Sequence, residues 1–563
     1  MKTNTPKMLI TVMLLTVLSF AMRASTNVSG GIFANTTWTL ANSPYIVTDT
    51  VVVFPGVTLT IQPGVTVAFA DNKRIEFRQA RLIAEGSNIS SITFTSSSLT
   101  PVAGIYPGIY LNGGTMTSRV RYCNFQYATN GINATLSDSL IVSNSYFTQN
   151  INGVQFIGTN VAEVCLVDSC IFNTNTNGLV IRTLHSSAIN HCNFTSNSTD
   201  GLVIDDADHN MVMTINHCSF TYNSDAGLLW HMHYMNINHC SFLNNTTGFG
   251  SFGYLSSLDS YNMTTKNSIF NNNQTGISTV AYMLLDSCKI NHNQTGSTCQ
   301  TRTRIRNCTI DSNSVLGISM NNDSIGNSSV KYNGAGIQVS TNSIIAGNTI
   351  DYNTGDNITC GTGTITITEN IISHGTIGID NNTAETLTIT KNTIQNNGIG
   401  IYLVSPGSTI NCNTICNNTT YDLKYLASTN IYASNNYWCT TDSVSTGAMI
   451  YDGHNNINYG LVNFMPFDTA QCFIITTGIS VNEAQDFQFS IYPNPVTDNL
   501  TVTLPAVSGK AKIEIHNMLG ELVYSSSVSS AKTNIDVSSM ATGIYVIQLT
   551  KGVNIERQKI IRQ

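Results

Sequence analysis

One repeated asparagine constrains this 563-residue chain more than any other feature. It recurs every 20 to 28 residues, always three residues after an apolar side chain, and a glycine usually follows three or four residues later. We interpret these as one ladder position, one core position and one turn position in each repeat. The asparagines are Asn150, Asn175, Asn197, Asn223, Asn245, Asn273, Asn293, Asn313, Asn333 and Asn353, their apolar partners are Phe147, Phe172, Phe194, Phe220, Phe242, Phe270, Ile290, Ile310, Val330 and Ile350, and the first glycines are Gly153, Gly178, Gly201 and Gly227.

The period favours a solenoid of strands over one of helices. From Ser268 to Asn348 the repeat is 20 residues four times running, which is too short for two helices and typical of one coil of strands. Runs such as residues 364–368 (TITIT) alternate β-branched and polar side chains. We therefore predict coils of three short strands, about 4.8 Å apart, with asparagine amides hydrogen-bonded along the stack and Phe rings stacked inside it.

This combination of an asparagine ladder, an interior stack that changes from aromatic to aliphatic, and coils of 20 to 28 residues resembles the right-handed parallel β-helix family, the pectate-lyase-like fold. The resemblance implies an all-β chain, with N-terminal capping coils over residues 26–118 and the parallel β-helix solenoid over residues 119–472. Residues 435–438 (NNYW) resemble a signature that often closes such helices, although Cys439 stands where a glycine is usual.

A different domain follows the repeats. Residues 473–487 have no coil pattern and are predicted to be a linker, and residues 488–563 predict a small antiparallel β-sandwich of short alternating strands. Their motif blocks, from IYPNPV at 491–496 to GIYVIQL at 543–549, resemble the type A C-terminal sorting domain of the type IX secretion system. That resemblance implies the type IX secretion machinery as a partner, and a protein that is secreted or displayed on the cell surface of a Gram-negative bacterium.

Composition and the N-terminus agree with export. Residues 1–25 carry two lysines, an uncharged apolar run and then small residues, which predicts a secretory signal peptide. We predict no transmembrane segment, because no other stretch is long and apolar enough. Only 10% of residues are charged and the net charge is -7, which argues against nucleic acid or a membrane surface as a partner.

The cysteines fall into two groups. Five of them occupy the coil position that asparagines take later in the chain, which predicts an interior row of small buried side chains and not a tetrahedral metal site. Near the closing end, we predict disulfides joining Cys412 to Cys416 and Cys439 to Cys472. The five are Cys192, Cys218, Cys240, Cys288 and Cys308, and the later asparagines are Asn348, Asn370, Asn392 and Asn413.

Aligning the coils on their glycines gives one candidate catalytic site. Arg182, Asp205 and His231 each lie four residues after a glycine in three consecutive coils, so they are predicted to face outward in a row. An acid, a base and a cation within reach suit proton abstraction from a uronate sugar or glycoside hydrolysis. The competing interpretation is a salt-bridge row on a surface. The flanking residues predicted to bind substrate are His185, Asp206, Asp208 and His233.

Known enzyme patterns are only partly present. Of the polygalacturonase motifs, only an Asp-Asp doublet, Asp205-Asp206, occurs here, and the carboxylates near Arg182 are few for a calcium site. We therefore predict no metal or other cofactor, with calcium entering only if the protein is a lyase. Two further rows stand out: His191, His217 and His239, which could hold zinc but are more typical of a turn face, and Arg302, Arg304 and Arg306, which are predicted to decorate a surface or to contact a sulfated or carboxylated glycan.

Three functions remain open. The leading hypothesis is a secreted, surface-displayed β-helix protein that binds polysaccharide or another surface and catalyses nothing. The alternative is a polysaccharide lyase or glycoside hydrolase that acts on uronate-containing glycans through Arg182, Asp205 and His231. A structural stalk or adhesin is the third, because fold alone does not decide function.

Overall fold

The structure is a computed structural model that describes residues 25–472 and 489–563. Short stretches within these ranges are not described: 114–116, 137–138, 159–163, 183–185, 206–211, 232–233, 252–261, 280–281, 301, 384–385, 504–510, 518–521, 529, 531 and 552–553. The predicted linker and all but the last residue of the predicted signal peptide lie outside the described residues. The chain divides into two units, Met1–Ile475 and Thr476–Gln563.

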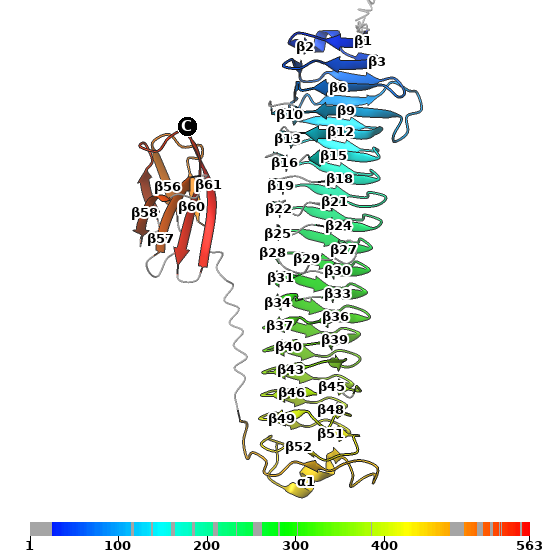
Figure 1. The fold of residues 1–563 in the computed structure, drawn as a ribbon, viewed down its shortest axis with the longest axis vertical. Helices are drawn as coiled ribbons and strands as arrows, with labels where there is room; N and C mark the ends of the chain where they lie inside the picture. Colours follow the sequence, from blue (N-terminus) through cyan, green and yellow to red (C-terminus); the bar gives the residue numbers. More distant parts are fainter. Residues whose placement is uncertain are drawn as a thin grey trace, which may run out of the picture. The chain divides into compact units, whose positions relative to one another are not determined.

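The first unit is a right-handed parallel β-helix, as predicted, and Figure 1 shows its coils stacked in chain order from β1 to α1. Sixteen coils of three strands run from β4 to β51, and equivalent strands of neighbouring coils pair in parallel. The coils therefore present three lateral faces, which we call the first-strand, second-strand and third-strand faces. Parallel pairing between coils satisfies the backbone of each short strand, which could not fold alone.

The first strands are β4 (Thr58–Ile61), β7 (Arg81–Glu85), β10 (Ser118–Arg121), β13 (Leu140–Ser143), β16 (Val164–Asp168), β19 (Ser186–Asn190), β22 (Val212–Asn216), β25 (Tyr234–Asn238), β28 (Asn262–Lys266), β31 (Met283–Asp286), β34 (Arg304–Arg306), β37 (Ser324–Gly326), β40 (Ser343–Ala346), β43 (Ile365–Thr368), β46 (Leu387–Thr390) and β49 (Thr409–Asn411).

The second strands are β5 (Thr66–Phe69), β8 (Ile92–Ser96), β11 (Cys123–Gln126), β14 (Tyr146–Thr148), β17 (Ile171–Asn173), β20 (Asn193–Thr195), β23 (Ser219–Thr221), β26 (Ser241–Leu243), β29 (Ile269–Asn271), β32 (Lys289–Asn291), β35 (Thr309–Asp311), β38 (Ser329–Lys331), β41 (Thr349–Asp351), β44 (Ile371–Ser373), β47 (Thr393–Gln395) and β50 (Thr414–Cys416).

The third strands are β6 (Arg74–Arg78), β9 (Tyr106–Asn112), β12 (Ala128–Leu136), β15 (Asn152–Gly158), β18 (Asn177–Arg182), β21 (Leu202–Asp205), β24 (Ala226–His231), β27 (Thr247–Ser251), β30 (Thr275–Thr279), β33 (Thr295–Cys299), β36 (Leu316–Asn321), β39 (Ala335–Ser340), β42 (Ile358–Cys360), β45 (Ile377–Asn381), β48 (Ile399–Leu403) and β51 (Tyr421–Tyr425).

Further elements stand at the two ends of the solenoid. They are β1 (Thr26–Ile32), β2 (Thr36–Trp38), a 3-10 turn (Leu40–Asn42) and β3 (Tyr45–Val53) at the start, and β52 (Ile431–Tyr432), α1 (Ser443–Ala448), β53 (Ile450–Tyr451) and β54 (Val462–Asn463) at the close. Among the described residues, no helix is long and apolar enough to span a membrane.

The asparagine ladder is confirmed. Asn245 donates from Nδ2 to Asn273 Oδ1 at 3.1 Å and to the Phe220 carbonyl at 3.0 Å, while its Oδ1 accepts from the Asn223 backbone N–H and Nδ2, both at 3.0 Å. The same pattern links the asparagines from Asn150 to Asn353, all of them buried. The Phe side chains stack inside, with ring centroids 4.7 Å apart for Phe220 and Phe242. The ladder therefore provides hydrogen-bond partners for the buried polar groups at each of these turns, which would otherwise be unpaired.

The cysteine row is interior, also as predicted. The five thiols are buried, and each lies one residue after a turn residue of positive φ. Cys288 N–H donates to Cys308 Sγ at 3.4 Å, and Cys308 N–H donates to Ser328 Oγ at 3.1 Å. Ser328 N–H continues the row to Asn348 Oδ1 at 3.0 Å. Thiol, hydroxyl and amide are therefore interchangeable acceptors at this one coil position.

The glycines do not serve as turn residues, so that interpretation was wrong. Gly153, Gly178 and Gly227 lie within third strands and none has a positive φ. A Cβ on Gly178 would lie 2.4 Å from the carbonyl oxygen of Gly201 in the next coil. Glycine is required because the backbones of neighbouring coils approach too closely for any side chain.

The predicted disulfide pairing was also wrong. Cys412 is bonded to Cys472, and Cys416 is bonded to Cys439. The ladder explains the second bond, because Asn413 bonds to Asn436 and the same step of 23 residues brings Cys416 beside Cys439. Residues one coil apart are neighbours in space, whereas Cys412 lies at the turn before β50 and Cys416 is the last residue of that strand, in the same coil.

The second unit is a pair of antiparallel sheets around its own apolar core, as predicted. One sheet contains β55 (Ser490–Tyr492), β56 (Asn499–Thr503) and β59 (Lys532–Asp536), and the other contains β57 (Ala511–Asn517), β58 (Leu522–Val528), β60 (Gly543–Lys551) and β61 (Asn554–Arg562). Leu500, Ile513 and Ile547 are among its fully buried side chains.

Candidate functional site

The row of Arg182, Asp205 and His231 forms at the ends of three adjacent third strands. Arg182 of β18 is in register with Asp205 of β21, and Asp205 is in register with His231 of β24, as predicted. His231 Nδ1 lies 3.3 Å from Asp205 Oδ1, and the two side chains keep 30% and 43% of their surface exposed. An ion pair this open to solvent stabilises the fold by less than about 1 kcal/mol. The catalytic role of the row stays a prediction.

Four further residues are predicted to bind substrate around this row. His185, Asp206, Asp208 and His233 all lie outside the described residues, in the segments that follow β18, β21 and β24. Their role also stays a prediction.

The three histidines of the second row stack on one another at turns between first and second strands. The rings of His191 and His217 are 5.2 Å apart, and those of His217 and His239 are 4.9 Å apart and nearly parallel. Burial and the two neighbouring rings lower the pKa of His217. Rings stacked in parallel do not direct three nitrogens at one point, as a zinc ion requires. Among the described residues, no group of three or more His, Cys, Asp or Glu could hold a metal ion.

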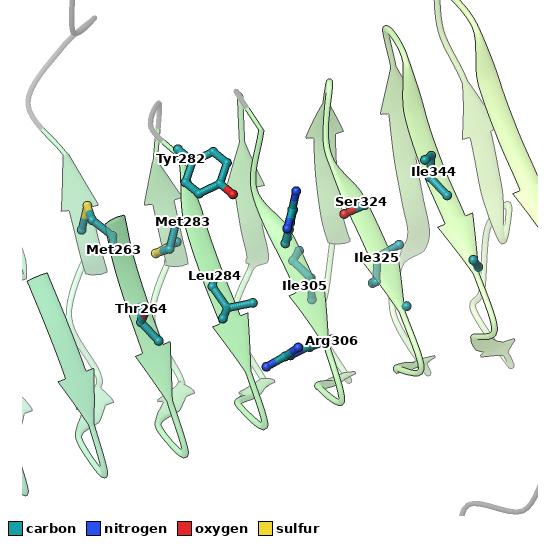
Figure 2. A pocket seen from close by; sticks show the side chains of 13 residues that line it. Met263, Thr264, Tyr282, Met283, Leu284, Ile305, Arg306, Ser324, Ile325 and Ile344 are labelled. Carbon is teal, nitrogen blue, oxygen red and sulfur yellow. The ribbon is translucent and has the colours of Figure 1, made fainter. Parts of the chain in front are cut away.

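A hollow of about 360 Å³ lies on the first-strand face, across β28 to β40. Figure 2 shows the side chains that line it. Its outward-facing row runs in register through Thr264, Leu284, Arg304, Ser324 and Ile344. The hollow arises because the small Ser324, Gly326 and Ala346 follow the long side chains of β31 and β34.

Two arginines give the hollow a positive wall. Arg304 and Arg306 are exposed on either side of the buried Ile305. The Arg304 guanidinium carbon lies 5.9 Å from the centre of the Tyr282 ring, and Arg306 donates to Asp286 Oδ2 at 2.8 Å. Burial would raise the pKa of Asp286, but hydrogen bonds from Asn307 and Arg306 hold it below its ordinary value. The hollow thus combines an aromatic ring, apolar contact area and guanidinium groups.

A second unusual row lies on the third-strand face near the closing end. Asp380, Tyr402, Lys424 and Tyr451 are in register on successive strands, and the Lys424 ammonium lies 5.4 Å from the Tyr402 ring and 5.6 Å from the Tyr451 ring. Asp380 is buried, and among the described residues its Oδ1 has no hydrogen-bond partner. Burial raises the pKa of Asp380 to about 6, and the charge of Asp356 contributes. Because Oδ1 is closed to solvent, the carboxylate is a cost to stability and not an open binding group.

Asp380→Asn is therefore expected to stabilise the solenoid at pH 8 and not at pH 3.5. The pKa of this carboxyl is near 3.8 in an unfolded chain and about 6 in the fold. The group therefore does not destabilise the fold below pH 3.8, and it destabilises the fold fully above pH 6, where it is ionised in both states. We expect a gain of about 1 to 3 kcal/mol at pH 8, measured by urea unfolding. The exposed Asp71→Asn is the control. An equal gain at both pH values would contradict the explanation that the ionised Asp380 carboxylate destabilises the fold.

The sequence contained signals for both missed features. Asp380 and Tyr402 stand two residues after Gly378 and Gly400, at a strand position that holds Ser, Thr or Gln in the five coils before them. Alternation along one strand marks the arginines of the hollow in the sequence, but no pattern marks Tyr282 and the small residues beside them. A hollow depends on side-chain size across five coils, which no single motif records.

Comparison with known proteins identifies both units. Residues 77–246 and 285–415 match the family described as "Right handed beta helix region", and residues 490–563 match the "Secretion system C-terminal sorting domain". The sorting domain indicates a protein that is secreted or displayed on the surface of a Gram-negative bacterium, as predicted.

One curated relative is the ulvan lyase NLR42 of Nonlabens ulvanivorans. It is 30% identical to this chain over 109 residues, which are 19% of this chain and 20% of the lyase. The chain thus matches about a fifth of the length of that relative.

Two solved structures show a distant likeness. A periplasmic alginate epimerase, AlgG, has a TM-score of 0.28 at 8% identity, covering 62% of this chain and 77% of the epimerase. Tailspike protein gp49 of Acinetobacter baumannii bacteriophage Fri1, a capsular polysaccharide depolymerase, has a TM-score of 0.21 at 10% identity, covering 90% and 73%.

Proposed function

Because this chain belongs to the right-handed β-helix family and ends in a secretion sorting domain, we propose that it is a surface protein that binds polysaccharide along its lateral face without cleaving it. The observation that carries the proposal is the hollow on the first-strand face. Tyr282, Leu284 and Ile344 offer it aromatic and apolar surface, and Arg304 and Arg306 offer it hydrogen-bond donors. Sugar rings need both, since they have apolar C–H faces and polar edges.

The regular coils extend the face on which a polymer would lie. Outward residues on this face alternate with buried ones on every first strand, so successive coils present equivalent positions at strand spacing. The curated relative, whose name describes a lyase of the polysaccharide ulvan, supports the same class of ligand.

The runner-up is a polysaccharide lyase or glycoside hydrolase that uses Arg182, Asp205 and His231. The contact of His231 Nδ1 with Asp205 Oδ1 and the register of all three residues favour it. In that case His231 or Asp205 would move the proton, Arg182 would hold the uronate carboxylate, and Asp206, Asp208, His185 and His233 would bind substrate. Calcium would belong to this mechanism only.

Asp205→Ala decides between the two proposals. We expect the variant to lose less than about 1 kcal/mol of stability, because the ion pair is exposed, and to bind glycan as the unchanged protein does. Ulvan, a polyuronate and a neutral glucan would be incubated with both proteins, while bound polymer and the ultraviolet absorbance of unsaturated products are followed. His191→Ala, which breaks a similar exposed pair with Asp168, is the matched control.

The opposite result is equally clear. Glycan cleavage by the unchanged protein that disappears in Asp205→Ala and persists in His191→Ala, with unchanged melting curves, would promote the enzyme to first place.

A further inference from the structure

We propose that the hollow on the first-strand face selects an acidic glycan by binding a carboxylate or sulfate group of one sugar at Arg304, with Arg306 beside it. This inference rests on the proposed function and adds the chemical class of the ligand and the residues that choose it.

The first support is the local charge. The chain as a whole carries a net charge of -7 and only 10% charged residues, yet Arg302, Arg304 and Arg306 are all exposed on one short segment. Positive charge gathered in this way on a charge-poor protein is complementary to an anionic ligand.

The two arginines of the hollow differ in whether a described carboxylate pairs with their charge. Arg306 is paired with Asp286, whose side chain is only 13% exposed, so its charge is largely neutralised and its position is fixed. No ion pair joins Arg304 to any residue that the structure describes. Arg304 lies over the Tyr282 ring, and its planar fork of N–H donors fits two oxygens of one oxyanion group.

The shape of the hollow favours a sugar as the carrier of that group. Beyond the arginines, Ser324 and Gly326 leave room, and Ile344 stays 48% exposed at the far side. A sugar whose acidic group meets Arg304 can therefore pack its apolar face against Leu284 and Ile344. Nucleic acid would require a longer basic track than this one segment supplies.

The test compares arginine pairs on the same face of the full-length protein. Arg304→Gln with Arg306→Gln removes the pair in the hollow, and Arg119→Gln with Arg121→Gln removes an exposed pair of the same spacing on β10. Binding to polygalacturonate, dextran sulfate and uncharged dextran is measured by calorimetry at low and high salt. The carboxylated and sulfated polymers separate the two sources of the oxyanion.

We expect the variant that lacks Arg304 and Arg306 to bind the acidic polymer about tenfold or more weakly than the unchanged protein. The variant that lacks Arg119 and Arg121 should differ from it by less than about twofold. High salt should weaken binding by the unchanged protein and have little further effect on the hollow variant. Asp286→Asn, which frees the charge of Arg306, should tighten binding by about threefold. If Asp286 had only a structural role, Asp286→Asn would not tighten binding of the acidic polymer.

Each contrary outcome has its own meaning. Equal losses from both arginine pairs would overturn the inference, because bulk charge would then explain binding. Equal affinity for dextran and the acidic polymers would also overturn it while leaving the proposed function in place. Binding of no polymer at all would overturn the proposed function and the inference together.

Discussion

Asn245→Leu is expected to lower the free energy of unfolding by about 3 to 5 kcal/mol. Leucine removes the acceptor for the backbone N–H and Nδ2 of Asn223, and the Nδ2 donor to the Phe220 carbonyl and to Asn273. These groups are buried, so water cannot replace the lost partner. The loss is measured by urea unfolding, and hydrogen exchange should show that it centres on the coils of β23 to β30.

The matched control is Asn236→Leu. Asn236 is an exposed strand residue of β25, in the coil that contains Asn245, so the same change of side chain should alter stability by no more than about 0.5 kcal/mol. Similar losses from the two variants would mean that the interior hydrogen bonds contribute little.

Gly248→Ala is expected to cost about 3 kcal/mol. The added Cβ would lie 2.5 Å from the carbonyl oxygen of Gly276 in the next coil and 3.2 Å from Phe242 Cβ. Neither neighbour can yield without moving the backbone, because both belong to the stacked strands. The two coils must separate locally, which also strains the ladder bond between Asn245 and Asn273.

Gly250→Ala provides the control on the same strand, β27. There the added Cβ would meet the ends of the Thr247 and Leu229 side chains at 3.2 and 3.6 Å, and these can rotate aside. We expect a change within about 1 kcal/mol, of either sign, since alanine also lowers the entropy of the unfolded chain. Melting temperatures of the two variants give the comparison, and equal losses would contradict the close-approach explanation.

The repeat made most of the fold predictable. Asn245, Phe242 and Cys240 each recur at one coil position, and a short period with alternating residues allows few architectures other than stacked strands. The C-terminal unit was predictable for another reason, because its motif blocks occur in a fixed order. The register of Arg182, Asp205 and His231 also followed from the glycine alignment.

The neighbour of a residue in the next coil was harder to predict from the sequence. The disulfide of Cys416 with Cys439 depends on a coil step of 23 residues, and the number of residues in each coil varies along the chain. The role of Gly178 depends on how closely two backbones approach, which its own sequence neighbours do not reveal.

The sequence by itself determined the period, the inward and outward sides of each strand, and the two units of the chain. These follow from spacing along the chain, which backbone geometry converts directly into position. Only the tertiary structure decided the hollow beside Arg304 and the burial of Asp380. Both depend on the sizes of side chains from several coils, which are far apart in the sequence and become neighbours only in the folded solenoid. No local sequence pattern therefore predicts them.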